Sequence, residues 1–230
     1  MDNVSEIREY RNKRRSFTDR EDAGEHLASM LEPDFRRDPR GLVLAIPSGG
    51  VPVGQVVSRR LSLPFDLILV RKLQIPHNTE AGFGAAALGG ETFLNQGLVG
   101  QLRLQENQIR EQEDKVRREL EERNQAFRGG RQQPGLADRK VILTDDGLAS
   151  GYTMIAAIDT ARKKGASSVV VAVPTAPLRS VETVSSLADS VYVASVKESG
   201  PFAVAEAYAN WKDLSREEVI SLLGGSLAGK

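Results

Sequence analysis

Short apolar runs recur along the chain and predict its secondary structure. Five of them have the length and flanking turn residues of buried parallel strands, and they occupy residues 42–46, 66–70, 141–144, 168–173 and 191–195. Helical patterns lie between them, at residues 53–61, 152–164 and 178–187. Strands that alternate with helices predict an α/β fold with a parallel sheet, and ligands of such sheets bind beyond the carboxyl ends of the strands.

Both ends of the chain carry helix start signals. A Thr-x-x-Glu sequence beginning at Thr18 and a Ser-x-x-Glu sequence beginning at Ser215 have the capping-box form, and each predicts a helix. We expect the first helix to end before a loop bracketed by Pro33 and Pro39.

The middle of the chain has a different pattern. Residues 82–88 and 91–95 are predicted to form a hairpin, and residues 97–127 one long charged helix, followed by a polar linker at 129–138. Part of the helix's apolar stripe repeats at sevens, which suits pairing with a second copy of the chain. Because the repeat is not sustained, we favour a helix that lies along its own domain. The stripe consists of Leu98, Leu102, Ile109, Val116 and Leu120.

Composition excludes several classes of protein. A chain of 230 residues fits one α/β domain with an appended lobe, and the absence of cysteine excludes disulfides and thiolate metal sites. Only His26 and His77 could supply imidazole ligands. Lys plus Arg and Asp plus Glu total 31 each, so no net charge attracts nucleic acid or an anionic membrane. The basic cluster at residues 11–15 is interpreted as a solvated helix end rather than as a nucleic-acid arm.

The same features suggest where the protein resides. No apolar run approaches the ~20 residues that span a bilayer. Residues 1–17 also lack the apolar core of a signal peptide. We therefore expect a soluble, cytoplasmic protein.

The turn after the strand at 141–144 carries the most specific chemistry. Asp145 and Asp146 lie at the carboxyl end of a buried strand, where unpaired carboxylates are costly and need hydroxyl donors or a cation. A ribose diol offers such donors, and a magnesium ion held by the same sugar offers charge. Gly147 and Gly151 allow the backbone to curl so that its N–H groups point inward.

The helix that follows this turn places its positive end behind the curled backbone, which suits a phosphate group. Acids for a sugar and a nest for its phosphate match the dimensions of ribose 5-phosphate. The residues predicted to line this part of the site, after the two acids, are Gly147, Leu148, Ala149, Ser150, Gly151, Tyr152 and Thr153.

Two further strand ends agree with an anion site. The strand at 42–46 leads into Pro47 and then Ser48, Gly49 and Gly50, where glycines allow close backbone approach to an anion. The strand at 66–70 leads into Arg71 and Lys72. Because side chains alternate along a strand, one of these two cations can point into the site while the other points away.

The run at 141–153 resembles the signature of type I phosphoribosyltransferases, which bind 5-phosphoribosyl 1-pyrophosphate (PRPP). Other segments resemble a branch of predicted phosphoribosyltransferases of unassigned substrate: residues 17–24, the Arg71-Lys72-Leu73 sequence with Pro76, Asn78 and Glu80, the long helix, and residues 202–208. Together they cover about residues 17–223. Two positions depart from this branch, since Ser48 replaces a usual Arg and Ala205 a usual Gly.

The resemblance implies a single domain over 1–230 with a parallel-sheet type I phosphoribosyltransferase fold. Residues 17–40 and 196–230 would form a small hood, and residues 97–139 a helical insertion. A Mg²⁺-dependent enzyme of nucleotide metabolism would then transfer ribose 5-phosphate from PRPP to a base-like acceptor. A homodimer is expected from the family.

The resemblance also implies roles for particular residues. Lys72 or Arg71 would neutralise pyrophosphate, and residues 48–50 would form the pyrophosphate loop. Asp145 and Asp146 would hold the ribose hydroxyls and, through substrate and water, the metal. Residues 73–82, with His77, would form a lid. Ala149 disfavours a 6-oxopurine acceptor of the usual kind, because those enzymes carry Asp at this loop position.

Two alternatives remain open at this point. A PRPP or nucleotide-binding regulator without catalytic activity would keep the run at 141–153 and could lose cations of the pyrophosphate loop, as Ser48 suggests. A dinucleotide enzyme would use the loose G-x-G-x-x-A sequence at 82–87, but that sequence leads into a predicted hairpin rather than a helix.

Overall fold

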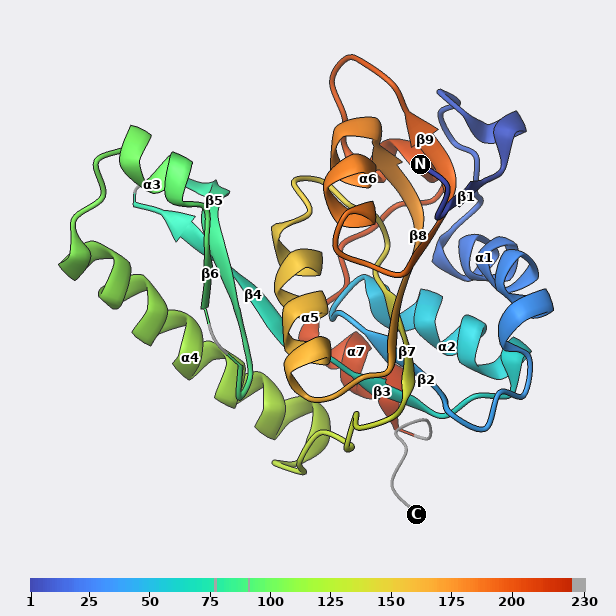
Figure 1. Ribbon diagram of the computed structural model, residues 1–230, viewed down its shortest axis with the longest axis horizontal. Coiled ribbons are helices and arrows are strands. Elements are labelled where there is room, and N and C mark those ends of the chain that lie inside the picture. Colours follow the sequence, from blue (N-terminus) through green and yellow to red (C-terminus); the bar gives the residue numbers. More distant parts are fainter. Residues whose placement is uncertain (77, 91, 225–230) are drawn as a thin grey trace.

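The protein is built on a six-stranded parallel sheet (Figure 1). The structure is a computed structural model that describes residues 1–76, 78–90 and 92–224, and only the backbone of residues 78–81. All neighbouring strands in this sheet run parallel. The order across the sheet is β1 (Val4–Glu6), β9 (Ser190–Lys197), β8 (Ser168–Pro177), β7 (Lys140–Thr144), β2 (Gly41–Ala45) and β3 (Phe65–Leu67).

Helices cover both faces of the sheet and explain the continuous apolar runs. The helices α1 (Arg20–Phe35) and α2 (Gly50–Leu61) pack on one face, and α5 (Tyr152–Lys163) and α6 (Leu178–Ser185) on the other (Figure 1). Along β2, Val43 contributes to the core under α1 and α2, whereas Leu42 and Leu44 contribute to the core under α5. The inner strands β2, β7, β8 and β9 are thus buried on both sides, as expected for a parallel sheet, whereas the edge strand β1 is not.

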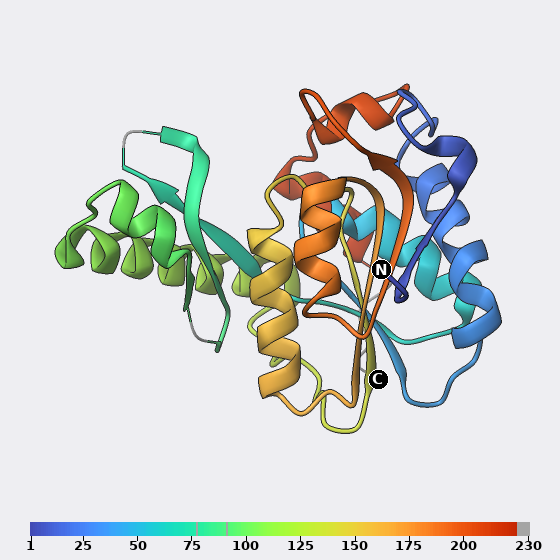
Figure 2. The ribbon, with the colours of Figure 1, turned by 45° about the horizontal axis from the view of Figure 1, so that its top comes forward.

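A separate three-stranded antiparallel sheet forms an arm beside this body (Figure 2). The predicted strand at 66–70 is wrong here, because the chain leaves the parallel sheet after Leu67 and enters the arm at Val70. The predicted hairpin is confirmed, and the G-x-G-x-x-A sequence lies in its first strand, with no helix directly after it. The arm consists of β4 (Val70–Ile75), β5 (Asn78–Ala87) and β6 (Thr92–Leu94).

The long charged segment forms two helices rather than one. α3 (Gln96–Gln101) ends at Leu102, and α4 (Glu106–Arg128) begins after Gln105, whose side chain takes part in a capping box. The helix α4 lies along its own chain, with Val116 and Leu120 buried in the core shared with the arm. The favoured interpretation of the apolar stripe is therefore confirmed for these two residues.

Both predicted boundaries of the first helix were wrong, and one short strand was not predicted. The cap of α1 is Asp19 rather than Thr18, and the helix continues through Pro33 to Phe35, whose burial compensates for the missing N–H of the proline. The strand β1 was not predicted; three residues are too few to show a pattern. The helix α7 (Arg216–Leu223) does begin at the predicted Ser215 capping box.

The predicted hood segments meet where Phe17 pairs with Tyr208. In the basic cluster, Arg11 pairs with Glu6 and Glu198, so part of its charge is neutralised within the chain. Among the described helices, none is both long and apolar enough to cross a membrane.

The buried stripe of α4 generates a stability prediction. Leu120 is 1% exposed and Leu102 is 39% exposed. We expect Leu120→Ala to lower the free energy of unfolding by about 2–5 kcal/mol, because it leaves a cavity, and Leu102→Ala to change it by less than about 0.5 kcal/mol. Urea denaturation measures both variants. Similar small effects would mean that α4 does not pack on its own domain.

Candidate functional site

The loops after β2 and β7 touch at the carboxyl edge of the sheet. These strands are neighbours, with Ala45 opposite Thr144. A Cβ atom added to Gly49 would lie 1.8 Å from Oδ2 of Asp146, and one added to Gly50 would lie 2.7 Å from the carbonyl oxygen of Thr144. Glycine is therefore required at these positions by packing against the acid pair, and not only by the close approach of an anion.

Asp146 is held by a buried guanidinium. Its Oδ2 atom lies 2.9 Å from both Nε and Nη2 of Arg20, and the two side chains are 15% and 9% exposed. The hydroxyl of Tyr208 donates to the backbone carbonyl of Asp146 at 2.6 Å. The second acid is thus fixed from the side chain and from the main chain.

Asp145 has no such counter-charge. Its Oδ1 atom accepts a hydrogen bond from the amide of Asp146 at 2.8 Å, and no described cationic side chain forms an ion pair with it. Burial, followed by the charge of Asp146, raises the pKa of Asp145 well above its usual range. Burial also raises the pKa of Asp146, although Arg20 opposes this shift. Within the described residues, the guanidinium of Arg20 is therefore the positive charge that faces both carboxylates.

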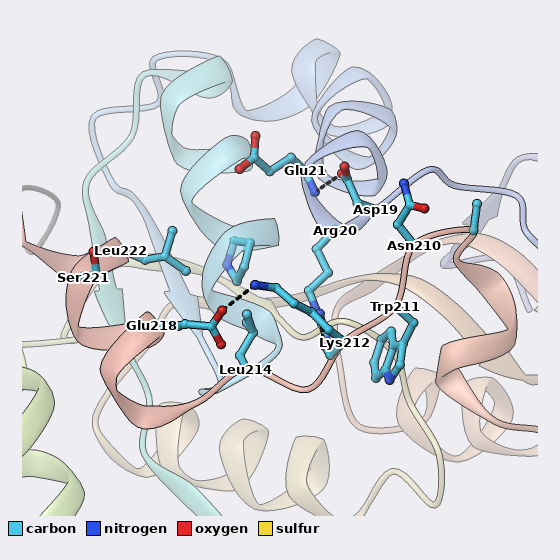
Figure 3. Close-up of a pocket in the computed structure, with 12 residues that line it drawn as sticks. Asp19, Arg20, Glu21, Asn210, Trp211, Lys212, Leu214, Glu218, Ser221 and Leu222 are labelled. Carbon is cyan, nitrogen blue, oxygen red and sulfur yellow. Dashed lines mark hydrogen bonds and ion pairs between the residues drawn. The ribbon is translucent and has the colours of Figure 1, made fainter.

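Arg20 is itself positioned by the C-terminal segment. Its Nη1 atom donates to the carbonyl oxygen of Lys212 at 2.9 Å, and its guanidinium carbon lies 4.0 Å from the ring centroid of Trp211. Arg20 and Trp211 line a cavity of about 770 Å³ between α1, the 209–214 segment and α7 (Figure 3). The acid pair is consequently connected to the wall of this cavity through a single side chain.

The turn after the acids offers unused amides. The amide of Leu148 donates to the carbonyl oxygen of Thr175 at 2.9 Å, so it is committed to the fold. Within the described part of the chain, the amides of residues 149–153 donate to no acceptor. Gly151 has φ +79°, a conformation that favours glycine, and it directly precedes α5. The turn thus presents free donors at a helix N-terminus, where an anion is stabilised.

Two side chains stabilise this turn from outside. The hydroxyl of Ser180 donates to the carbonyl oxygen of Ala149 at 2.6 Å. The side-chain amide of Asn95 donates to the hydroxyl of Tyr152 at 2.6 Å, which ties the start of α5 to the arm. The side chain of Tyr152 is therefore engaged with the arm. Ser150, by contrast, is exposed.

The two predicted cations of the next strand end point to different sides of the arm. Nε of Arg71 lies 2.6 Å from Oε2 of Glu119 on α4. Lys72 follows on the opposite face, and its aliphatic stem lies against Gly82 of the neighbouring strand. Both residues therefore lie on the arm rather than on the parallel sheet. His77 and the side chain of Glu80 lie outside the described residues.

The acid pair can supply only part of the ligands that a metal ion needs. Within the described residues, no three His, Asp or Glu side chains lie close enough together to hold an ion by themselves. Asp145 and Asp146 fit an ion that takes most of its ligands from a substrate and from water, as Mg²⁺ commonly does.

This geometry agrees with a family comparison. A sequence model described as the phosphoribosyl transferase domain matches residues 16–200, which include both loops and the acid pair. The chain belongs to this family.

Two relatives extend the comparison. A protein of Mycobacterium tuberculosis, named "putative phosphoribosyl transferase" in strains CDC 1551 and H37Rv, is 38% identical over 207 residues. The match covers 90% of this chain and 46% of that protein, so the chain spans less than half the length of these relatives. The crystal structure of TT1426 from Thermus thermophilus superposes with a TM-score of 0.76 at 33% identity, covering 92% of this chain and 99% of that one.

The expected parallel-sheet phosphoribosyltransferase fold is thereby confirmed. The sequence did not identify Arg20 or Tyr208 as site residues, although both belong to segments that resembled the family. Their partner atoms are 126 and 62 residues away along the chain, and no local pattern reports such contacts.

The buried ion pair predicts an unequal response to two arginine substitutions at α1. Arg20→Ala leaves the Asp146 carboxylate without its partner, and we expect it to lower the free energy of unfolding by roughly 3 kcal/mol. Arg36→Ala removes an exposed pair with Glu32 and should cost less than about 1 kcal/mol. Chemical denaturation compares them, and equal costs would refute the structural role of Arg20.

The raised pKa of Asp145 predicts that Asp145→Asn increases the free energy of unfolding in a pH-dependent way. Because the folded-state pKa lies above the unfolded value, ionisation of Asp145 lowers the wild-type free energy of unfolding as pH rises above about 4. Asparagine cannot ionise, so the variant should match wild type near pH 4 and become more stable than wild type towards pH 8. Thermal denaturation across this range measures the difference. A difference in stability that does not depend on pH would contradict the claim that the Asp145 carboxylate lacks a cationic partner.

Proposed function

We propose that the chain is a PRPP-dependent phosphoribosyltransferase, which transfers ribose 5-phosphate to a nitrogen nucleophile and releases pyrophosphate. One observation carries the proposal: two carboxylates with a single counter-ion directly precede a turn whose amides at 149–153 lack acceptors in the described structure. Family membership supports the same reaction class.

Each part of the site takes one part of the substrate. Asp145 and Asp146 accept hydrogen bonds from the ribose hydroxyls, which supply the donor that Asp145 lacks beyond the amide of Asp146. The amides of 149–153 bind the 5-phosphate, with the hydroxyls of Ser150 and Thr153 as further donors. Within the sequence-based assignment of residues 147–153, the amide of Leu148 is excluded as a phosphate donor, because it donates to Thr175.

The pyrophosphate group would lie against residues 48–50. The amides of Ser48 and Gly49 donate to no described acceptor, whereas those of Gly50 and Val51 donate to Ile46 and Ser48 within the loop. Lys72 or Arg71 is assigned to neutralise its charge. When bound, Mg²⁺ would add positive charge beside the same oxygens, held mainly by substrate and water.

The reaction breaks the bond between the anomeric carbon and the pyrophosphate oxygen, and it forms a bond from that carbon to the acceptor nitrogen. The electron pair of the broken bond leaves with pyrophosphate, and the nitrogen gives up its proton to solvent or to a base. Positive charge develops on the sugar, as in glycoside hydrolysis. The protein contributes positioning and stabilises the leaving group's charge.

A PRPP-binding regulator without turnover is the second candidate. Ser48 offers no positive charge in the loop, and Arg71 is paired with Glu119. Pyrophosphate release in the presence of PRPP, Mg²⁺ and a panel of nucleobases distinguishes the two functions. Release with one base favours the transferase, whereas PRPP binding without release on any base favours the regulator.

The binding site itself is tested by a thermal-shift titration with PRPP and Mg²⁺. At 100 times its dissociation constant a ligand stabilises the folded state by about 2.7 kcal/mol. We expect this stabilisation in wild type and in Asp159→Asn, which alters an exposed pair with Lys163 on α5. An Asp145→Asn, Asp146→Asn double variant should lose it. Equal stabilisation of all three proteins would overturn the proposed site.

A further inference from the structure

The long helix α4 places an arginine at the proposed pyrophosphate loop. Nη1 of Arg123 lies 3.4 Å from the carbonyl oxygen of Pro47, the residue directly before that loop. Arg123 is 76 residues away from Pro47 along the chain, so the contact depends on how α4 packs against the body. A cation from the helical insertion thus stands beside the loop in which Ser48 itself supplies no charge.

Arg123 belongs to a group of three arginines with few acidic partners. Arg71 is ion-paired with Glu119, and Arg216 donates to the backbone carbonyl oxygen of Glu122 at 3.2 Å. Arg123 forms no ion pair with any described carboxylate. Besides its hydrogen bond to Pro47, its guanidinium carbon lies 6.0 Å from the ring centroid of Phe127. Arg123 is therefore the member of this group that both contacts the loop and has no acidic partner among the described residues.

The surroundings of Arg123 favour binding of an anion. Partial burial is the largest cause of a lowered pKa at Arg123, and the charges of Arg71 and Arg216 add to it, while Glu119 opposes the shift. A guanidinium that is partly desolvated beside like charges gains more from an anionic partner than an exposed one does. A pyrophosphate group at residues 48–50 would provide that partner.

We propose that Arg123 binds the pyrophosphate group of PRPP and supplies positive charge beside residues 48–50, which carry no charged side chain. This inference rests on the proposed function and adds a residue from α4 to its site. The guanidinium remains anchored on Pro47 through one nitrogen, and its other donors, which have no acceptor among the described residues, bind phosphate oxygens. The helical insertion would then complete the active site rather than only support the arm.

The proposal is tested by calorimetric titration with three ligands: PRPP with Mg²⁺, inorganic pyrophosphate with Mg²⁺, and ribose 5-phosphate. We expect Arg123→Gln to weaken PRPP and pyrophosphate binding by about tenfold or more, because a charge-assisted hydrogen bond is lost. Ribose 5-phosphate should bind equally well, since it uses the turn at 149–153. Arg123→Lys should recover part of the loss.

Arg118→Gln is the matched control, because Arg118 is an exposed residue of the same helix. It should bind all three ligands as wild type does. Thermal denaturation checks that each variant is folded. Wild-type PRPP affinity in a folded Arg123→Gln variant would overturn the role of Arg123 alone. A wild-type protein that binds neither PRPP nor ribose 5-phosphate would instead overturn the proposed function on which it rests.

Discussion

The candidate site depends on a deficit of positive charge, because one buried guanidinium faces two adjacent carboxylates in the part of the chain that the structure describes. Arg20 neutralises Asp146 at 2.9 Å, whereas Asp145 accepts a hydrogen bond from the amide of Asp146 and has no cationic partner of its own among the described residues. Burial makes this arrangement unfavourable in the free protein, as the raised pKa of Asp145 indicates. A ligand that brings hydroxyl donors or positive charge relieves the shortage. The same ion pair joins α1 to the acid-bearing turn. It therefore affects both the charge of the site and the packing of the N-terminal helix.

Parallel strands bring the remaining parts of the site together. Because β2 and β7 are neighbours that run in the same direction, their following loops must meet, and Gly49 lies so close to Asp146 that no larger residue fits. The free amides of the turn at 149–153 begin the next helix. The helix α4 reaches the same edge from the side, where Arg123 lies 3.4 Å from the carbonyl oxygen of Pro47. Chemistry is thus concentrated where chain connections converge, as in other open α/β sheets.

Local patterns predicted the parts of the protein whose cause is local. Runs that are buried on both faces identified the strands, and the acids with their glycine turn identified the centre of the site. Failures occurred where distant contacts decide: helix α1 continues past Pro33 because Phe35 is buried beyond it, and the strand expected at 66–70 divides between two sheets. Arg20 and Arg123 were unpredictable as site residues for the same reason.

A crystal structure of the protein with PRPP and Mg²⁺ tests the central claim most directly. We expect ribose hydroxyls within hydrogen-bond distance of Asp145 and Asp146, and the 5-phosphate on the amides of residues 149–153. A ligand bound elsewhere, with Asp145 still lacking a hydroxyl or cationic partner, would contradict it.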